Sequence, residues 1–387
     1  MWSSFKPWNP DLPLMKAVPL ERLVPEYIKN FEAYVPSKPD DVLKKYYGCS
    51  RLIRLNNNEN PLGPPPGAQA VIRRFPPARA AVYPSGDSFH LREKLADCHG
   101  LHPDQFLVGN GANEVITFVI KAFCQQGDNI ITADRTFSVY EWVAEFSGSE
   151  ARLVPLKDFG FDAQAMLEGI DERTKILFLC NPNNPTGSYW SQEELTCFLE
   201  KISGRQIVVM DEAYAEFVEK EDYPNGLDLI RQYPNLVVFR TFSKMFALAG
   251  LRIGYLAGDP EVVDMIRRTA VVYSVNGVAQ EAALAALNDQ EHIHRTREMV
   301  KRGKQFLIKE LTRLGLPHIS GEGNFIMIKV PENDSLVYRK MMTRGVMIRT
   351  MTGFRFPNYI RVTVADQESL EIFVEALGRC LSPSQND

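Results

Sequence analysis

The sequence predicts an α/β protein in which a large unit with a mostly parallel β-sheet is followed by a smaller α+β unit. From about residue 56 to 275, short apolar runs alternate with amphipathic stretches, which is typical of βαβ units. From about residue 276 the pattern changes to longer helical stretches between a few short apolar runs. The first 55 residues are rich in proline and aromatic side chains, which indicates an arm lying on another surface. The expected division is therefore 1–55, 56–275 and 276–387.

The individual elements follow from apolar runs for strands and from helical periodicity for helices. In the large unit, strands are expected at 105–108, 129–132, 175–180, 206–210 and 236–239. In the smaller unit, strands are expected at 324–328, 346–348 and 360–363, with helical patterns over 278–314 and 367–380. The arm contains only a weak helical pattern, near residues 20–34.

Composition excludes several classes of protein. A net charge of -4 without a long basic run argues against nucleic acid as a partner. No apolar stretch approaches the ~18 residues of a membrane span, and six scattered cysteines without a CxxC pair indicate a reducing cytoplasm. No metal site is expected, because the six histidines show no metal-ligand spacing. His292 and His294 would lie on different faces of a helix and are expected at a solvated surface.

Lys244 is the most informative residue. The apolar run Leu236–Phe239 leads into Thr241-Phe-Ser-Lys244, so a buried strand is expected to end at a polar site. A lysine there can form a Schiff base with an aldehyde. The adjacent hydroxyl groups, together with Arg252, suit a phosphate. An aldehyde and a phosphate on one small molecule indicate pyridoxal 5′-phosphate (PLP).

Three further residues follow predicted strands, where ligand groups gather in open α/β sheets. Asp211 ends the run 207–210 and could pair with a pyridine nitrogen, or it could cap a helix. Tyr214 could donate to the ring's phenolic oxygen, or it could be a core tyrosine. Asn184 lies in the proline-rich turn Asn181–Gly187, which would fix its direction as a second donor to that oxygen, or the turn could have no role beyond reversing the chain.

Two weaker signals precede these residues in the chain. The turn Gly109–Glu114 lies between a predicted strand and a predicted helix, where free N–H groups and the helix dipole favour a phosphate. Glycine pairs are common in such turns, so this signal is weak alone. Phe137 could stack on a flat ring, although a lone phenylalanine is more often part of the core.

Taken in chain order, these stretches resemble the fold-type I PLP enzymes of the aminotransferase class I/II group, and within it the histidinol-phosphate branch. The resemblance covers about residues 20–377. The stretches that carry it are Asn57–Gly63, Tyr83-Pro84, Gly111–Glu114, Asn181–Gly187, Asp211–Tyr214, Thr241–Lys244 and Ala249–Arg252.

The resemblance implies a seven-stranded, mostly parallel sheet and a role for each site residue. Lys244 would form the Schiff base, Asp211 would pair with the pyridine nitrogen, and Phe137 would stack on the ring. Asn184 and Tyr214 would contact the phenolic oxygen. Tyr83 would reach the phosphate from a partner subunit, so a homodimer is expected. The cofactor phosphate would be held by Ala112, Asn113, Thr241, Ser243 and Arg252.

The resemblance also implies a reaction, the transamination of L-histidinol phosphate with 2-oxoglutarate. Arg361 resembles a bidentate carboxylate clamp. Arg349 and Tyr34 resemble residues that meet the phosphate of the amino donor. The stretch Thr350–Phe356 departs from the usual pattern, with Arg355 as an extra cation near the substrate loop.

Three alternatives remain open at this stage. An aminotransferase for aromatic amino acids is the nearest, because a pocket for imidazole can admit a phenyl ring. A PLP lyase, such as threonine-phosphate decarboxylase, would use the same scaffold. A PLP-binding regulator would need a DNA-binding module, and no basic helix-turn-helix pattern precedes residue 56.

Overall fold

The computed structural model describes residues 19–33, 37–202 and 204–381. Its centre is a seven-stranded sheet with the order β2-β8-β7-β6-β5-β3-β4, in which β8 is antiparallel to both of its neighbours and the other pairs are parallel. The expected mostly parallel sheet is therefore confirmed. Its strands are β2 (Phe106–Gly109), β3 (Asn129–Ala133), β4 (Glu150–Val154), β5 (Thr174–Cys180), β6 (Ile207–Asp211), β7 (Leu236–Thr241) and β8 (Gly254–Ala257).

Both faces of this sheet are buried, which explains why its central strands are apolar at consecutive positions. In β6, Val208 and Met210 belong to one core cluster, whereas Val209 belongs to another on the opposite face. The Val209 face is covered by α5 (Ala112–Phe123), α6 (Val139–Phe146) and α10 (Pro260–Arg267). The other face packs on elements that include α4 (Phe89–His99) and α8 (Gln192–Lys201).

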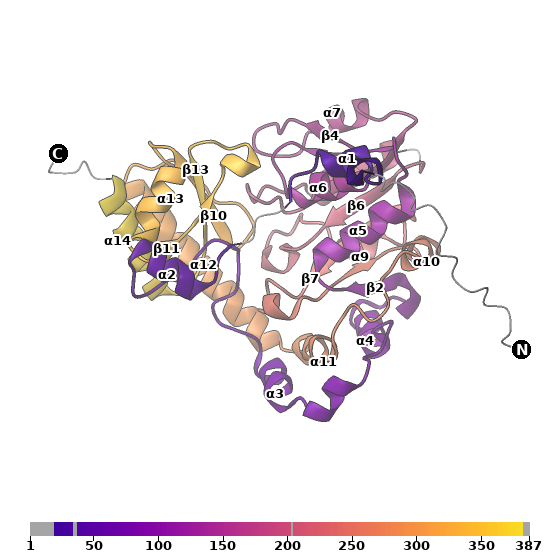
Figure 1. Ribbon diagram of the computed structural model, residues 1–387, viewed down its shortest axis with the longest axis horizontal. Coiled ribbons are helices and arrows are strands. Elements are labelled where there is room, and N and C mark those ends of the chain that lie inside the picture. The colour runs from indigo at the N-terminus through magenta and orange to yellow at the C-terminus, as the bar shows by residue number, and fades with distance from the viewer. Residues whose placement is uncertain (1–18, 34–36, 203, 382–387) are drawn as a thin grey trace, which may run out of the picture.

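The C-terminal elements form a second layer beside the large sheet, drawn in orange and yellow in Figure 1. Their sheet is antiparallel and has the order β12-β13-β10-β9. The elements of this unit are β9 (His318–Ile319), β10 (Phe325–Lys329), α13 (Asp334–Met342), β11 (Val346–Met347), β12 (Arg349–Thr350), β13 (Tyr359–Thr363) and α14 (Gln367–Leu381).

The helical pattern over 278–314 corresponds to two helices rather than one. They are α11 (Gly277–Ala286) and α12 (Gln290–Arg313). The break lies at Asp289, whose side chain accepts from the backbone N–H of His292 and so starts α12 as its N-cap. In space, α11 packs against α3 (Pro66–Arg74) and α4 at the base of the large unit, whereas α12 continues to α14 (Figure 1).

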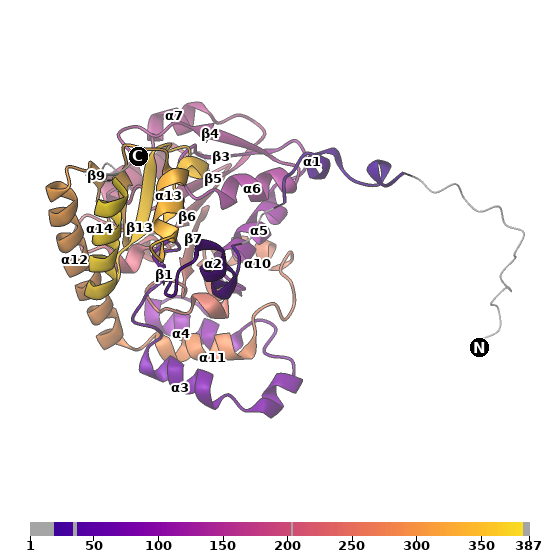
Figure 2. The same ribbon diagram turned by 60° about the vertical axis from the view of Figure 1, so that its left-hand side comes forward.

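Within the first 55 residues, the structure describes three short helices and one strand. The weak pattern near 20–34 is limited to η1 (Leu20–Arg22) and α1 (Glu26–Lys29), and α1 lies against α6. Further on, α2 (Asp40–Tyr47) lies with the C-terminal elements in Figures 1 and 2, and β1 (Ile53–Arg54) pairs with β11. This segment therefore contacts both units.

The remaining elements are short connections. They are η2 (Pro77–Ala81), η3 (Pro103–Gln105), α7 (Ala163–Glu168), η4 (Ala215–Phe217), α9 (Gly226–Leu229), η5 (Ala249–Leu251) and η6 (Thr352–Phe354). Among the helices of the described ranges, none combines the length and the apolar character that crossing a membrane requires.

Candidate active site

Several strands of the large sheet have an end at the same edge, which is the edge where the parallel strands have their carboxyl ends. Gly254, the first residue of β8, is paired with Gly109 at the end of β2 and with Thr241 at the end of β7. Because β8 is antiparallel, its beginning lies where its neighbours end. The neighbouring strands β6 and β5 end at this edge with Asp211 and Cys180, which are also paired. The sheet register alone thus brings together segments that are far apart in the sequence.

A cavity of about 630 Å³ opens at this edge. It lies between the large sheet and the C-terminal unit, because Phe354 of η6 and Arg361 of β13 also line it. Most of the site residues predicted from the sequence meet here: Ala112, Asn113, Phe137, Asn184, Asp211, Tyr214, Thr241, Ser243, Lys244, Arg252, Arg349 and Arg361.

Lys244 points its amine at the backbone of the Asn57 segment. Its Nζ donates to the Asn57 carbonyl oxygen at 2.7 Å. Burial lowers the pKa of Lys244 from its ordinary 10.5 to about 8, and the nearby cations of Arg361 and Arg252 act in the same direction. A substantial fraction of this amine is therefore uncharged near neutral pH, as nucleophilic attack on an aldehyde requires.

Asp211 is a buried carboxylate with a tyrosine partner. Its Oδ2 accepts from the Tyr140 hydroxyl at 2.6 Å, and its Oδ1 accepts from the Ala213 N–H at 3.0 Å. Burial raises the pKa of Asp211. A carboxylate in such a setting is stabilised by a cation brought to it, and a protonated pyridine nitrogen is one.

Tyr214 is held so that its own proton is available. The Tyr214 hydroxyl accepts from Asn58 Nδ2 at 2.8 Å, and its ring packs edge-on against Phe325. Burial raises the pKa of Tyr214 to about 12, so the hydroxyl stays protonated at neutral pH. It can therefore donate to an anionic oxygen in the cavity while accepting from Asn58.

The Asn181–Gly187 turn is hydrogen-bonded to the loop that follows β3. Asn183, which is fully buried, accepts from the Thr136 hydroxyl at 2.7 Å and donates to the Arg135 carbonyl at 3.2 Å. In Asn184, the side-chain carbonyl oxygen accepts from Arg361. Since a guanidinium can only donate, the amide nitrogen of Asn184 must be the group that is turned away from Arg361.

Glycine is required where the turn before α5 meets Arg252. Gly111 has a φ of 84°, and a Cβ built there would collide with the Arg252 guanidinium. A Cβ at Gly254 would lie 3.4 Å from the Ala112 nitrogen. The start of α5 and Arg252 thus lie close together, and Ala112, Asn113 and Arg252 line the cavity. Backbone N–H groups and a guanidinium are the donor set that a phosphate prefers.

Arg361 is a buried cation with capacity left for a ligand. It is 4% exposed, it donates to the Asn56 carbonyl at 3.0 Å, and its guanidinium lies 5.3 Å from the Phe325 ring centroid. Burial lowers the pKa of Arg361 to about 10. Its guanidinium lines the cavity, and each of its two terminal nitrogens donates one hydrogen bond, so it has N–H groups left to donate to an anion.

Comparison with known proteins assigns the chain to a family. The model of the aminotransferase class I and II family matches residues 50–377. The chain belongs to the class I and II aminotransferases. It is 37% identical to a histidinol-phosphate aminotransferase of Moorella thermoacetica over 358 residues, which covers 92% of each chain. It is 39% identical to the enzyme of that name from Symbiobacterium thermophilum, over 92% of this chain and 97% of the relative.

Solved structures agree on the fold. A histidinol-phosphate aminotransferase from Sinorhizobium meliloti, solved in complex with pyridoxal-5′-phosphate, superposes with a TM-score of 0.82 at 23% identity. The match covers 92% of this chain and 96% of that one. The fold-type I architecture of this aminotransferase is thereby confirmed.

PLP is the cofactor of this family, and the cavity of this aminotransferase suits it. Lys244, whose amine is partly uncharged near neutral pH, lines the same cavity as the buried carboxylate of Asp211, which could serve as the counter-charge of a pyridinium. Ala112, Asn113 and Arg252 line one part of the cavity and offer donors for a phosphate, and a Cβ at Gly111 would displace the Arg252 guanidinium. Phe137, which meets Tyr140 edge-on at 5.6 Å, supplies an aromatic face in the same cavity.

Among the predicted site residues that the structure describes, one does not line this cavity. Tyr83 is 79% exposed and stacks on Tyr273, with ring centroids 4.7 Å apart. Tyr34 falls outside the described residues.

One histidine is not where the sequence predicted it, and two partners of the site residues were not predicted. His292 is buried, not solvated, and its Nε2 lies 3.0 Å from the Met245 carbonyl oxygen, which also accepts from Asn60. His294 is exposed, as expected. Tyr140 and Asn58, which orient Asp211 and Tyr214, were not anticipated. Tyr140 follows the helical apolar pattern and reads as core, and Asn58 was noted only as part of a family stretch.

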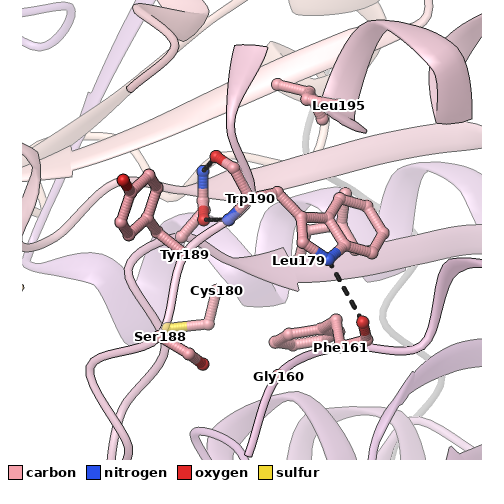
Figure 3. Close-up of a pocket in the computed structure, with 9 residues that line it drawn as sticks. Gly160, Phe161, Leu179, Cys180, Ser188, Tyr189, Trp190 and Leu195 are labelled. Carbon is pink, nitrogen blue, oxygen red and sulfur yellow. Dashed lines mark hydrogen bonds between the residues drawn. The ribbon is translucent and has the colours of Figure 1, made fainter. Parts of the chain in front are cut away.

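A second, much smaller cavity of about 10 Å³ lies beside β5 and has a structural explanation (Figure 3). Trp190 closes it by donating from Nε1 to the Phe161 carbonyl at 3.1 Å. The Trp190 backbone N–H donates to Asn181 Oδ1 at 2.8 Å, and Asn181 Nδ2 donates back to the Trp190 carbonyl. These contacts fix the start of the Asn181–Gly187 turn, and the space is large enough for no more than about one water.

Proposed function

We propose that this aminotransferase transfers the amino group of L-histidinol phosphate to 2-oxoglutarate, as a step of histidine biosynthesis. The observation that carries the proposal is the pair of arginines, Arg349 and Arg361, in the cavity that contains Lys244. The donor has one phosphate and the acceptor two carboxylates, so both need cations beyond those that would hold the cofactor. The relatives of that name, at 37–39% identity over 92% of the chain, support the same choice.

In this proposal the chain's own groups bind, orient and move protons, and PLP supplies the electron sink that makes the substrate Cα–H bond acidic. Lys244 Nζ accepts the proton released from the substrate Cα, which its lowered pKa favours. Asp211 would keep a positive charge on the pyridine nitrogen. Tyr214 and the Asn184 amide would donate to the phenolic oxygen.

Arg361 would take the acceptor's carboxylate near the reacting carbon, and Arg349 would take the more distant anionic group. Arg361 is fixed by Asn184 and the Asn56 carbonyl, so its direction is set before a ligand arrives. Tyr34 is proposed to assist Arg349. The cofactor phosphate would be held by Ala112, Asn113, Thr241, Ser243 and Arg252.

The chain is proposed to work as a homodimer in the cytoplasm. Val82, Tyr83, Val272 and Tyr273 are all largely exposed in the single chain, and exposed apolar groups of this kind mark interaction surfaces. In the dimer, Tyr83 would reach the partner's phosphate site. Tyr83→Phe should then lower the affinity for PLP while sedimentation velocity still reports a dimer; a wild-type monomer would contradict the proposal.

The test of substrate is a comparison of kcat/KM for L-histidinol phosphate and phenylalanine with 2-oxoglutarate in excess. A preference for phenylalanine of tenfold or more would overturn the first choice. The second candidate is then an aromatic amino-acid aminotransferase, which the aromatic side chains of Phe137, Trp142 and Phe354 in the cavity wall favour.

A further inference from the structure

The stretch Thr350–Phe356 joins the C-terminal unit to the large unit at the rim of the cavity. Its beginning is held by Asp334, which is fully buried. The Met351 and Thr352 N–H groups each donate to Asp334 Oδ2 at 2.8 Å, and the Thr352 hydroxyl donates to Oδ1 at 2.6 Å. The carboxylate therefore fixes the conformation of the loop where it leaves β12.

The far end of the loop is held by an ion pair across the two units. Arg355 donates to both carboxylate oxygens of Glu141, at 3.0 and 2.7 Å, and to the Asp134 carbonyl at 3.0 Å. Glu141 lies in α6, next to Trp142, which lines the cavity. A bidentate arginine pair fixes orientation as well as distance, so this contact sets how the loop sits on the rim.

The backbone of Arg355 adopts an unfavourable conformation where η6 ends. Its φ of 59° and ψ of 27° lie in the left-handed region, which is unfavourable for a residue with a Cβ. Phe159, on the large-unit side, also has a left-handed φ of 65°, and its ring stacks on Phe356 at 6.1 Å. The Arg135 guanidinium lies 5.1 Å from the same Phe356 ring.

Phe354 is the residue whose position these contacts determine. It is buried, it lines the cavity, and its ring centroid lies 5.6 Å from the Arg349 guanidinium carbon and 5.7 Å from that of Arg361. The ring is therefore in contact with both of the arginines that are proposed to bind the substrate. Arg361 is anchored to Asn184 and Asn56 independently of the loop, whereas Phe354 moves if the loop does.

We propose that Phe354 is a specificity-determining residue and that Arg355, through its ion pair with Glu141, is the positioning residue that holds it as the wall of the substrate end of the cavity. This inference rests on the proposed function and adds to it a basis for selecting the donor. A donor with a planar ring and an anionic group would have to bind against Phe354 for its anionic group to reach the arginines. The acceptor 2-oxoglutarate carries no ring and would depend less on that wall.

The test is a comparison of donor and acceptor KM in variants of the ion pair. Glu141→Gln and Arg355→Gly should each raise KM for L-histidinol phosphate roughly fivefold, the size expected for a partly exposed bidentate pair. The KM for 2-oxoglutarate and kcat should change less than twofold. Arg355→Lys, which keeps the charge, should recover part of the loss. Unchanged donor KM, or an equal rise for donor and acceptor, would overturn the inference.

Matched controls separate this effect from a general loss of structure. Glu332→Gln removes an ion pair of 2.6 Å with Lys340, which lies wholly within the C-terminal unit, and should leave both KM values unchanged. Phe354→Leu should lower donor selectivity, and adding Arg355→Gly to it should cause no further loss, because both act through one wall. Additive losses would contradict a shared role.

A failure of the proposed function can be distinguished from a failure of this inference. If the wild-type protein does not turn over L-histidinol phosphate, the proposed function fails. The same variants are then measured with the amino donor that the enzyme prefers, and the same split between donor and acceptor KM is required.

Discussion

The amine of Lys244 should be neutral far more often than that of an ordinary lysine. With its pKa lowered from 10.5 to about 8, roughly one quarter of the amine is neutral at pH 7.5, against about one in a thousand for the ordinary value. The neutral fraction rises with pH and levels off about one pH unit above the midpoint. Reactivity of Lys244 should therefore increase between about pH 7 and 9 and change little above that.

Competitive labelling of the cofactor-free protein with acetic anhydride measures this directly. The extent of modification of the Lys244 peptide is followed by mass spectrometry as a function of pH, with peptides carrying exposed lysines as the reference for reagent. The midpoint is expected near pH 8. Arg361→Gln should move it upward, because that guanidinium is the largest cause of the lowered pKa after burial. A wild-type midpoint above about pH 10 would refute the reasoning.

Three further outcomes are expected. Asp211→Asn should lower kcat by about a hundredfold or more, since it removes the buried counter-charge of the pyridine nitrogen; kcat near the wild-type value would contradict that role. Gly111→Ala should weaken PLP binding about tenfold in a fluorescence titration, because the added Cβ presses on Arg252. Gly127 also has a left-handed φ, but the space around it is open. Gly127→Ala should therefore lower stability and leave the PLP affinity unchanged. His292→Ala should lower the free energy of unfolding in urea by about 1–2 kcal/mol, because the Met245 carbonyl loses a buried partner; no change would mean that water replaces it.

The central strands could be predicted because they are buried on both faces and therefore apolar at consecutive positions. The edge strand β4 (Glu150–Val154) carries Glu150 and Arg152 on its partly exposed side, so no apolar run marks it. The antiparallel strand β8 was also missed. Its run Gly254–Ala257 is short and contains a glycine, which weakens the strand signal even though all four residues are buried.

The site could be predicted where residue type and strand position agree, as for Lys244 and Asp211. The residues that orient them were not predictable, because their partners are distant in the sequence. Tyr140 precedes Asp211 by 71 positions and reads as a core residue of α6. His292 belongs to a helix beyond the large sheet, and its contact with the Met245 carbonyl depends on the packing of that helix.

The reversed strand β8 has a consequence for which cofactors the protein can accept. Between Thr241 and Gly254 the chain leaves the sheet edge and returns to it, so the reactive amine and Arg252 are delivered by one short loop. That loop is rigid, since the Leu248 N–H donates to the Phe242 carbonyl at 3.0 Å and the Phe242 N–H donates to the Ile253 carbonyl at 3.2 Å. The length of the loop therefore fixes the distance between the Lys244 amine and Arg252. A vitamer whose aldehyde and anionic group are spaced differently would reach either Lys244 or Arg252, but not both.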